Sequence, residues 1–417
     1  MIFSVLLIIL AVFGAPLFTI IAASAMLGYV QEEIDLMAII IQVIGMSSLP
    51  FLSAIPLFTF AGYVLSESNA PHRVVRLTRA LLGWMPGGLA LVCLAACAFF
   101  TAFTGASGVT IIALGAILYP ALNHDGYPEK FSLGLVTSAG SLGLLFAPSL
   151  PLILYGVVSN VSIDDLFRAG IVPGVLMLIM LSGYSMWVSG RSDQQLRKFS
   201  SKELAGALRE AMWELPLPVV VLGGIYSGFF AVSEAAAVTA LYVLIVEVGI
   251  MKEIKLRQLP KVMRESMLLV GGILIILGVS LASTNYMIDA GVPQQLLEYM
   301  SEYVTSQGTF LILLLIFLLI LGAILDIFSA IVLVVPLILP IAAQYGVDEV
   351  HLGIVFLAAM QLGYLTPPVG LNLFIASYRF EKPIMQVYSA TLPFLLILLG
   401  SVLLITYWPA LSLWLVG

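Results

Sequence analysis

The sequence predicts an all-α polytopic membrane protein made of two inverted repeats, each with a re-entrant helical hairpin and a broken helix. Two observations support this fold class. The 417 residues are 61% hydrophobic and only 10% charged, whereas soluble domains contain about 25% charged residues. One pattern also occurs twice, about 220 residues apart, and each copy interrupts an apolar run. The apolar runs leave room for roughly ten spans of ~20 residues.

The repeated pattern is clearest at the two interruptions. Residues 142–149 read Leu-Gly-Leu-Leu-Phe-Ala-Pro-Ser, and residues 362–369 read Leu-Gly-Tyr-Leu-Thr-Pro-Pro-Val. The flanking sequence agrees as well, since Pro120 corresponds to Pro340. Paired Gly/Pro-interrupted segments in corresponding halves indicate the binding site of a secondary transporter. Isolated helix kinks in a packed bundle are the alternative, and the matched hairpin before each interruption disfavours it.

Basic residues predict the orientation in the membrane. Thirteen of the 17 Lys and Arg residues fall in three clusters, which the positive-inside rule places on the cytoplasmic side. The clusters are Arg73, Arg76 and Arg79; Arg191, Arg197, Lys198, Lys202 and Arg209; and Lys252, Lys255, Arg257, Lys261 and Arg264. Acidic stretches poor in Lys and Arg are expected outside, at 32–35, 164–165, 289–302 and 348–349.

This orientation predicts the course of each apolar segment. In the first half, 84–103 and 106–122 form a hairpin from the cytoplasmic side, the interrupted segment 131–160 crosses outward, and 166–190 returns. In the second half, 265–283 crosses outward, 308–325 and 327–343 form a hairpin from the outer side, the interrupted segment 350–378 crosses inward, and 384–414 crosses outward. The first membrane helix is expected within 1–27, and 29–66 holds either one crossing or a surface helix plus a crossing. Residues 200–214 are expected to form an interfacial helix.

Four predicted non-helical turns carry the candidate chemistry. They are the hairpin tips at 104–108 and 326–329 and the breaks at 146–149 and 366–370. Unwound backbone is tolerated at membrane depth only where it is buried in protein or lines a polar cavity. Each proline removes an N–H donor and frees a carbonyl on the preceding turn. Such carbonyls with Ser and Thr hydroxyls suit Na⁺, and half-helix N-termini favour an anionic group.

The candidate residues follow from these turns. The cation-site candidates are Thr104, Gly105, Ser107, Gly143, Pro148, Asp326, Ser329, Gly363, Thr366 and Pro367. The substrate-binding candidates are Ser107, Ser149, Gly370 and Asn372. Asp326 lies alone within apolar sequence, where a carboxylate is costly and usually functional; a structural hydrogen-bond partner is the alternative. Glu234 fits helix capping as well as function.

Other residue types suggest no further chemistry. Cys93 and Cys97 are expected to be buried without a disulfide, and His124 and His351 to face solvent. Residues 105–108 match the short Gly-x-Ser-Gly signature of rhomboid intramembrane proteases, but no histidine lies deep in an apolar run to act as the base. An enzyme is therefore not expected. No nucleotide-binding phosphate loop and no basic face for nucleic acid occur in the sequence.

The motifs resemble the large membrane subunit, the M component of DctM or SiaM type, of tripartite ATP-independent periplasmic (TRAP) transporters. The resemblance covers nearly the whole chain. It rests on residues 54–62, 87–90, the first hairpin tip, 148–156, 234–237, Leu325-Asp326 and, most specifically, 365–373. The family usually has Ser-Gly-Ser-Ser at the first tip, where this chain has Thr104-Gly105-Ala106-Ser107, so one hydroxyl is missing. The usual Pro-Pro of the first break is Ala147-Pro148 here.

The resemblance implies an elevator-type carrier, similar to the ion transporter superfamily, that imports a small organic anion (carboxylate or sulfonate) with Na⁺ as coupling ion and no organic cofactor. It implies a separate four-helix Q-type membrane subunit, an extracytoplasmic P-type substrate-binding protein, and the bacterial inner (cytoplasmic) membrane. The expected parts are scaffold helices and linker (1–83), two transport-domain halves (84–165 and 284–383), further scaffold with an interfacial arm helix (166–283), and a terminal helix (384–417). The alternatives are a stand-alone Na⁺/dicarboxylate symporter and a non-transporting membrane scaffold subunit.

Overall fold

The computed structural model describes residues 7, 9–10, 13–46, 49, 52–190, 199–301 and 303–416. Over these ranges the chain is helical, with no β-strand. Six of the helices are long and apolar enough to cross a membrane, or up to eight if each of two bent helix pairs counts as one span. The predicted all-α polytopic fold class is confirmed. Arg191, Arg197, Lys198 and Glu302 lie outside the described residues.

The N-terminal part differs from the prediction of one helix within 1–27. Gly14 has a φ of +83°, and Pro16 is extended, so α2 begins only at Leu17 and ends at Gln31. The reason is local, because a left-handed glycine followed by a proline interrupts a helix. The region 29–66 contains two further helices, α3 (Met37–Gly45) and α4 (Ala54–Glu67). Helix α4 is half buried, whereas α3 buries none of its residues.

The first unit has the predicted hairpin and broken helix. Its elements are α5 (Ala70–Leu82), α6 (Gly88–Thr104), α7 (Ser107–Ala113), α8 (Gly115–His124), α9 (Glu129–Ala139), the 3₁₀ turn η2 (Leu142–Leu145), α10 (Leu150–Ser159) and α11 (Ile163–Ser189). Helices α7 and α8 meet at 50°, and the α9–η2 segment meets α10 at 42°. We call α6 with α7 and α8 hairpin 1, and the segment between η2 and α10 break 1.

A connecting region joins the two units. It contains α12 (Ser201–Glu210), α13 (Pro216–Tyr226) and α14 (Val232–Leu244), which continues as the π-helical turn η3 (Ile245–Ile250). The predicted interfacial helix within 200–214 corresponds to α12, whose charged and apolar positions alternate at helical spacing. Helix α12 packs against α5.

The second unit repeats the order of the first. Its elements are α15 (Leu259–Asp289), α16 (Val292–Ser301), α17 (Gln307–Ile324), α18 (Ile327–Gln344), α19 (Glu349–Gly363), α20 (Leu371–Phe380), α21 (Ile384–Tyr407) and α22 (Ala410–Leu413). We call α17 with α18 hairpin 2, and the segment between α19 and α20 break 2. The expected loop at 289–302 is mostly α16, and the predicted helix 384–414 is interrupted after Tyr407.

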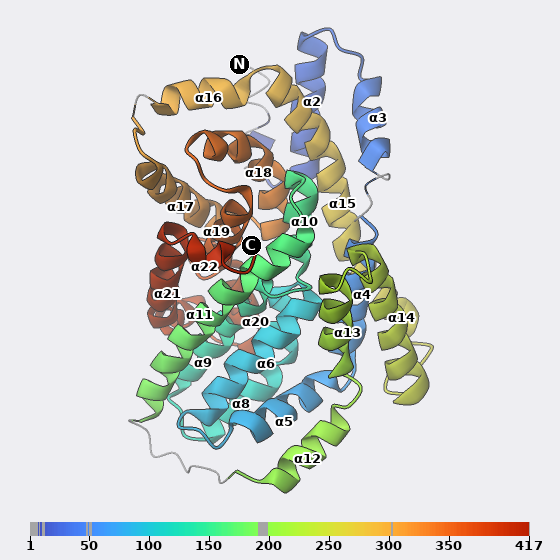
Figure 1. The fold of residues 1–417 in the computed structure, drawn as a ribbon, viewed down its shortest axis with the longest axis vertical. Helices are drawn as coiled ribbons and strands as arrows, with labels where there is room; N and C mark the ends of the chain where they lie inside the picture. The colour runs from blue at the N-terminus through green and yellow to red at the C-terminus, as the bar shows by residue number, and fades with distance from the viewer. Residues whose placement is uncertain are drawn as a thin grey trace.

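The boundaries of the two units correspond closely. Helices α8 and α18 end 220 residues apart, α9 and α19 begin 220 residues apart, and α10 and α20 begin 221 residues apart. Hairpin 1 lies in the lower half of Figure 1 and hairpin 2 in the upper half. This arrangement is compatible with the predicted inversion.

The two units are interlocked rather than side by side. Helix α7 of hairpin 1 packs against α20 of the second unit, and α18 of hairpin 2 packs against α10 of the first. The central helix α19 is buried from His351 to Gly363, and α9 is buried from Phe131 to Ala139. Each broken helix is therefore covered partly by the hairpin of the other unit.

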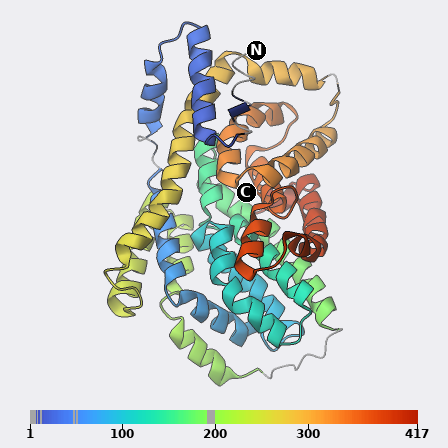
Figure 2. The same ribbon diagram turned by 180° about the vertical axis from the view of Figure 1, so that it is seen from behind.

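Charge is distributed toward the two ends of the bundle. Helices α5 and α12, with most of the described residues of the first two basic clusters, lie at the lower end of Figure 1. The turn between α2 and α3, which contains Glu32, Glu33 and Asp35, lies at the opposite end with α16. The view from behind shows the same separation (Figure 2). The α5–α12 end is therefore the one that the positive-inside rule predicts to face the cytoplasm.

Candidate functional site

The tip of hairpin 1 is a turn of two residues. Gly105 ends α6 with a φ of +64°, and its N–H donates to the Thr101 carbonyl at 2.8 Å. A Cβ at this glycine would lie 2.5 Å from the Leu150 side chain at the start of α10. Thr104 and Ser107 flank the tip and are buried. Position 105 needs glycine for two reasons: its φ is positive, and Leu150, directly after break 1, leaves no room for a side chain.

Break 1 contains an orphaned buried hydroxyl. Ser149 precedes α10 and is fully buried, and its Oγ has no hydrogen-bond partner among the residues that the structure describes. The peptide bond between Ala147 and Pro148 is cis. Pro148 lacks the N–H that a continuous helix would direct at the Leu144 carbonyl. A buried polar atom without a partner is unfavourable unless a ligand or water satisfies it.

The 3₁₀ turn η2, which comes just before break 1, packs directly on hairpin 1. A Cβ at Gly143 would lie 2.3 Å from the Ala98 carbonyl oxygen and 2.6 Å from the Ala102 nitrogen, both on α6. The Gly143 carbonyl accepts a hydrogen bond from the Phe146 N–H at 3.1 Å. Thr101 Oγ1 lies 2.8 Å from the Gly140 carbonyl oxygen and so also links hairpin 1 to this segment.

The tip of hairpin 2 is organised by Asp326. This residue is the N-cap of α18, and its Oδ1 accepts hydrogen bonds from the backbone N–H groups of Phe328 and Ser329, each at 3.0 Å. Its Oδ2 accepts a hydrogen bond from the Ser329 hydroxyl at 2.5 Å. The Ile327 N–H donates to the Tyr364 hydroxyl of break 2 at 2.7 Å. The structural role weighed for Asp326 is therefore present, and its exposed carboxylate keeps acceptor capacity for a cation.

Break 2 mirrors these contacts in the second unit. A Cβ at Gly363 would lie 2.5 Å from the Gly322 Cα on α17, and the Gly363 carbonyl accepts from the Thr366 N–H at 2.9 Å. The Thr366 hydroxyl donates to the Leu362 carbonyl at 3.1 Å. Pro367 is exposed and forms a cis peptide bond with Pro368.

The chain returns to helix at Gly370. This residue has a φ of +59° and precedes α20, and its N–H donates to the Ala323 carbonyl of hairpin 2 at 3.1 Å. A Cβ here would lie 2.5 Å from the Leu373 side chain and 2.9 Å from the Thr366 carbonyl oxygen. Glycine is needed for this backbone conformation.

One polar network connects the two units. The Ser107 hydroxyl donates to Asn372 Oδ1 at 2.7 Å, and Asn372 Nδ2 donates to the Thr137 carbonyl at 3.4 Å. Ser107 and Asn372 are both buried. The network therefore joins the hairpin 1 tip, the helix after break 2 and the helix before break 1.

The structure brings the predicted residues together in three groups. The tip of hairpin 1 contacts break 1, the tip of hairpin 2 contacts break 2, and Ser107 with Asn372 joins the two units. Four helices, α7, α10, α18 and α20, begin at these turns, and a helix N-terminus favours an anion. No group of three or more His, Cys, Asp or Glu residues in the described ranges could hold a metal ion. A cation here would need carbonyl and hydroxyl oxygens.

Sequence reasoning missed several residues of these groups. Thr101, Thr137, Gly322 and Tyr364 contribute contacts that no motif predicts. Two of them could have been suspected from their positions in the sequence. Gly322 lies one turn before the second tip, and Tyr364 lies inside the second interruption.

The remaining candidates have structural roles. Glu234 accepts a hydrogen bond from the Ala231 N–H at 2.9 Å at the start of α14, which is the capping alternative. The prediction that His351 faces solvent is wrong, because its ring lies 3.2 Å from both the Ser412 hydroxyl and the Thr406 carbonyl oxygen in the protein interior.

Three other predictions about these residue types are confirmed. His124 is exposed, and Cys93 and Cys97 are buried free thiols.

Solved structures with the same fold are membrane transporters. The YdaH transporter of Alcanivorax borkumensis aligns with a TM-score of 0.64 at 14% identity, over 91% of this chain and 88% of that one. MtrF of Neisseria gonorrhoeae, described as one of a class of antimetabolite efflux pumps, aligns with a TM-score of 0.57 at 12% identity, over 89% and 83% of the two chains. At this identity the likeness concerns the fold.

Paired interrupted helices inside a multi-pass bundle are characteristic of secondary transporters. Residues 2–411 match the family of the tripartite ATP-independent periplasmic transporter, DctM component. The chain belongs to this family, so it is a transporter subunit and not an enzyme, as predicted.

Relatives in this family are similar over most of the chain. The C4-dicarboxylate TRAP transporter large permease protein DctM of Rhodobacter capsulatus is 35% identical over 378 residues, which cover 87% of this chain and 86% of that protein. The ectoine/5-hydroxyectoine TRAP transporter large permease protein UehC of Ruegeria pomeroyi is 32% identical over 412 residues, 98% and 96% of the two chains. The isethionate TRAP transporter permease protein DctMQ of Oleidesulfovibrio alaskensis is 34% identical over 406 residues, 97% of this chain but 62% of that protein.

Proposed function

We propose that this chain imports a small organic anion across the bacterial inner membrane, driven by a Na⁺ gradient through an elevator-type movement. The observation that carries the proposal is the Ser107–Asn372 hydrogen bond. It joins a hairpin tip of one unit to the broken helix of the other, so that a ligand bound there would contact both units. Binding sites between repeats at mid-membrane are the general arrangement of secondary transporters.

The oxygen atoms at the four turns suit a coupling Na⁺. Ser149 Oγ is buried without a partner in the described part of the chain, and the prolines of both breaks leave backbone carbonyls without their helical donors. The hydroxyls of Thr104, Ser107 and Thr366, the carbonyls of Gly105, Gly143 and Gly363, and the Asp326–Ser329 pair are the groups that we propose to hold the ion. Bound Na⁺ would supply positive charge beside an anionic substrate.

The substrate is proposed to be a carboxylate or sulfonate. The names of the relatives specify C4-dicarboxylate, isethionate and ectoine. Asn372 offers an amide, and the N-termini of α7 and α20 offer backbone N–H groups that favour a negative charge. Ser107, Ser149, Gly370 and Asn372 are therefore proposed to contact the substrate.

The partners are proposed from the family. A transporter described as tripartite needs two further components, and we propose a small Q-type membrane subunit and an extracytoplasmic P-type binding protein. The DctMQ relative, of which this chain covers 62%, is compatible with a Q-type part fused in that protein. The hairpins and broken helices (84–165 and 284–383) would move against scaffold helices in 1–83 and 166–283.

The main alternative is a stand-alone Na⁺/dicarboxylate symporter that takes substrate directly from solution, and a non-transporting scaffold subunit is a further one. Reconstitution of the chain with its Q-type partner in liposomes separates them. We expect uptake of a labelled C4-dicarboxylate or sulfonate only with both an inward Na⁺ gradient and the binding protein. Uptake without the binding protein would favour the symporter, and no uptake of any tested anion would favour the scaffold.

A further inference from the structure

A buried ion cluster lies away from the candidate transport site. Arg73 of α5 contacts three glutamates, each from a different segment of the connecting region. Its Nε donates to Glu214 at 2.5 Å, its Nη1 donates to Glu253, and its Nη2 lies 3.1 Å from Glu247 Oε1 and 3.3 Å from Oε2. We call these four residues the Arg73 cluster.

The charges of the Arg73 cluster do not balance. One guanidinium faces three carboxyl groups, which would leave two negative charges in excess if all were ionised. The side chains of Arg73, Glu214 and Glu247 are 8%, 5% and 1% exposed, and Glu253 is 15% exposed. An uncompensated buried carboxylate is so unfavourable that the group is neutralised instead.

The geometry indicates which carboxyl is neutral. Arg73 makes its closest contacts with Glu214 and Glu253, whereas Glu247 shares one nitrogen at longer distance. Glu247 is also the most buried of the three, with 1% of its side chain exposed. The carboxyl with the longest contact to the guanidinium and the least exposure is the one that neutralisation stabilises most, which assigns the proton to Glu247.

Burial and the ion pairs act in opposite directions on the groups of the cluster that lie outside the membrane-spanning segments. Burial acts to raise the pKa of Glu253, but the hydrogen bonds from Arg73 and Asn69 and the charge of Arg73 together leave the pKa below its usual range. Burial raises the pKa of Glu214, against the opposing effect of Arg73. Burial opposes the charge on Arg73, yet its acidic partners, Glu253 above all, leave the pKa of the guanidinium raised.

Among the described residues, the ion pairs of the three glutamates all go to Arg73. Glu247 lies in the π-helical turn η3, which packs against α14, and α14 packs in turn against α4 and α13. Titratable groups on these elements and on the loop of Glu253 include Tyr63 on α4, Tyr242 on α14, and the exposed Lys252 and Lys255.

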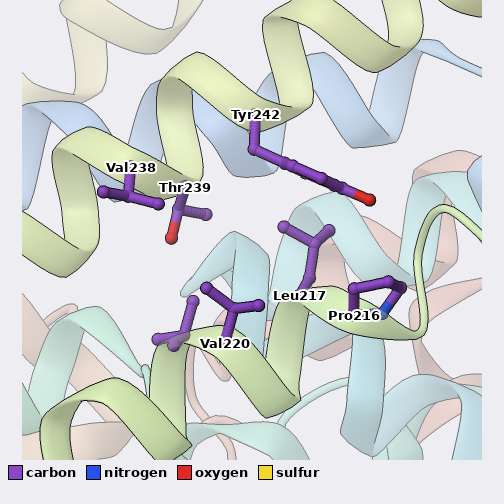
Figure 3. Close-up of a pocket in the computed structure, with 7 residues that line it drawn as sticks. Pro216, Leu217, Val220, Val238, Thr239 and Tyr242 are labelled. Carbon is purple, nitrogen blue, oxygen red and sulfur yellow. The ribbon is translucent and has the colours of Figure 1, made fainter.

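The Tyr242 hydroxyl has a hydrogen-bond partner outside the cluster. Its hydroxyl donates to the Trp213 carbonyl at 2.8 Å, and its ring extends from α14 over the start of α13 (Figure 3). The pocket beneath it is lined mainly by apolar side chains such as Leu217 and Val238 and has no charged residue in its lining.

We propose that the Arg73 cluster is a proton-binding site, in which Glu247 carries one solvent-derived proton at neutral pH. The site is independent of the proposed Na⁺ and substrate sites. It ties α5, the connection between α12 and α13, the end of α14 and the loop before α15 to a single guanidinium. Loss of the proton would put two uncompensated negative charges at this junction.

The test is the pH dependence of thermal unfolding of the full chain in lipid nanodiscs. Because the native state holds a proton that the unfolded chain releases above the ordinary glutamate pKa of about 4.3, stability should fall as pH rises from about 5 through neutrality and level off once Glu247 itself deprotonates, with the Tm of the wild type dropping by roughly 2–5 °C across this range. Glu247→Gln, which mimics the protonated group, should flatten this slope. The control Glu210→Gln removes the exposed partner of Arg76 and should keep the wild-type slope.

Two further comparisons make the test decisive. Glu253→Gln should lower the Tm at all pH values, because it removes a charged partner of Arg73, and an equal loss in Glu247→Gln would overturn the proposal. A wild-type Tm that rises with NaCl but not with choline chloride, an effect lost in Glu247→Gln, would assign the site to Na⁺ instead. If Glu247→Gln does not fold, the infrared carbonyl band of a protonated carboxyl in the wild type decides, and its absence rejects the proton.

Discussion

The Ser107 hydroxyl donates a 2.7 Å hydrogen bond to the side-chain oxygen of Asn372, 265 residues further along the chain. Ser107 belongs to the first unit and Asn372 to the second. The bond therefore depends on the assembly of both units, and it lies where two helices, α7 and α20, begin. Substitutions at this pair therefore test the contact between the two units.

Ser107→Ala should destabilise the protein by about 1–3 kcal/mol, because it leaves the buried Asn372 oxygen without its donor. Asn372→Ala should cost a similar amount, and the double variant should cost less than the sum of the two. Thermal unfolding of the three variants measures this coupling. Ser227→Ala, at an exposed serine with a local hydrogen bond, is the control and should change little. Additive effects would show that the two residues do not act as a pair.

Asp326→Asn should abolish the Na⁺ dependence of uptake while the protein still inserts and folds, because asparagine caps a helix as well as aspartate does. Asp348→Asn is a matched control. Asp348 caps α19 with the same geometry, accepting from the N–H groups of Val350 and His351 at 2.9 and 3.0 Å. Uptake in liposomes at varied Na⁺ checks both variants. Unchanged Na⁺ dependence in Asp326→Asn would remove Asp326 from the cation site.

Gly363→Ala should destabilise break 2 by about 1–3 kcal/mol, because the added methyl group would meet the Gly322 backbone. The control is Gly183→Ala on α11, where a Cβ has no neighbour within 4 Å. That change should stabilise the helix by about 0.5–1 kcal/mol. The Tm of the two variants should therefore move in opposite directions from that of the wild type.

His351→Leu should cost about 1–3 kcal/mol, because it leaves the buried Ser412 hydroxyl and the Thr406 carbonyl without a partner. The exposed His124 provides the comparison, and His124→Leu should have little effect on unfolding. Equal stability of the two variants would mean that the His351 contacts contribute nothing.

The helix interruptions could be predicted from the sequence because their causes are local. Pro148 and Pro367 cannot continue a helix, and Gly105 and Gly370 allow left-handed turns that other residues rarely adopt. The extent of the first helix was predicted wrongly by hydropathy alone, since apolar residues continue through Gly14 and Pro16.

Pairing between the units could not be predicted in the same way. The sequence identifies Ser107 and Asn372 as separate candidates, but periodicity carries no information about contacts 265 residues apart. His351 follows two acidic residues and so has the surroundings of a surface loop in the sequence. Its partners come from the C-terminal segment, which only the tertiary fold brings to it.

The exchange of partners between the units constrains how the chain can assemble. Since α7 is covered by α20 and α10 by α18, neither half can bury its own hairpin and broken helix without the other. A protein divided between residues 190 and 199 should accumulate only when both fragments are made together, and a fragment made alone should be degraded. An ancestor consisting of a single half would have been stable only as a pair of copies that covered each other in this way.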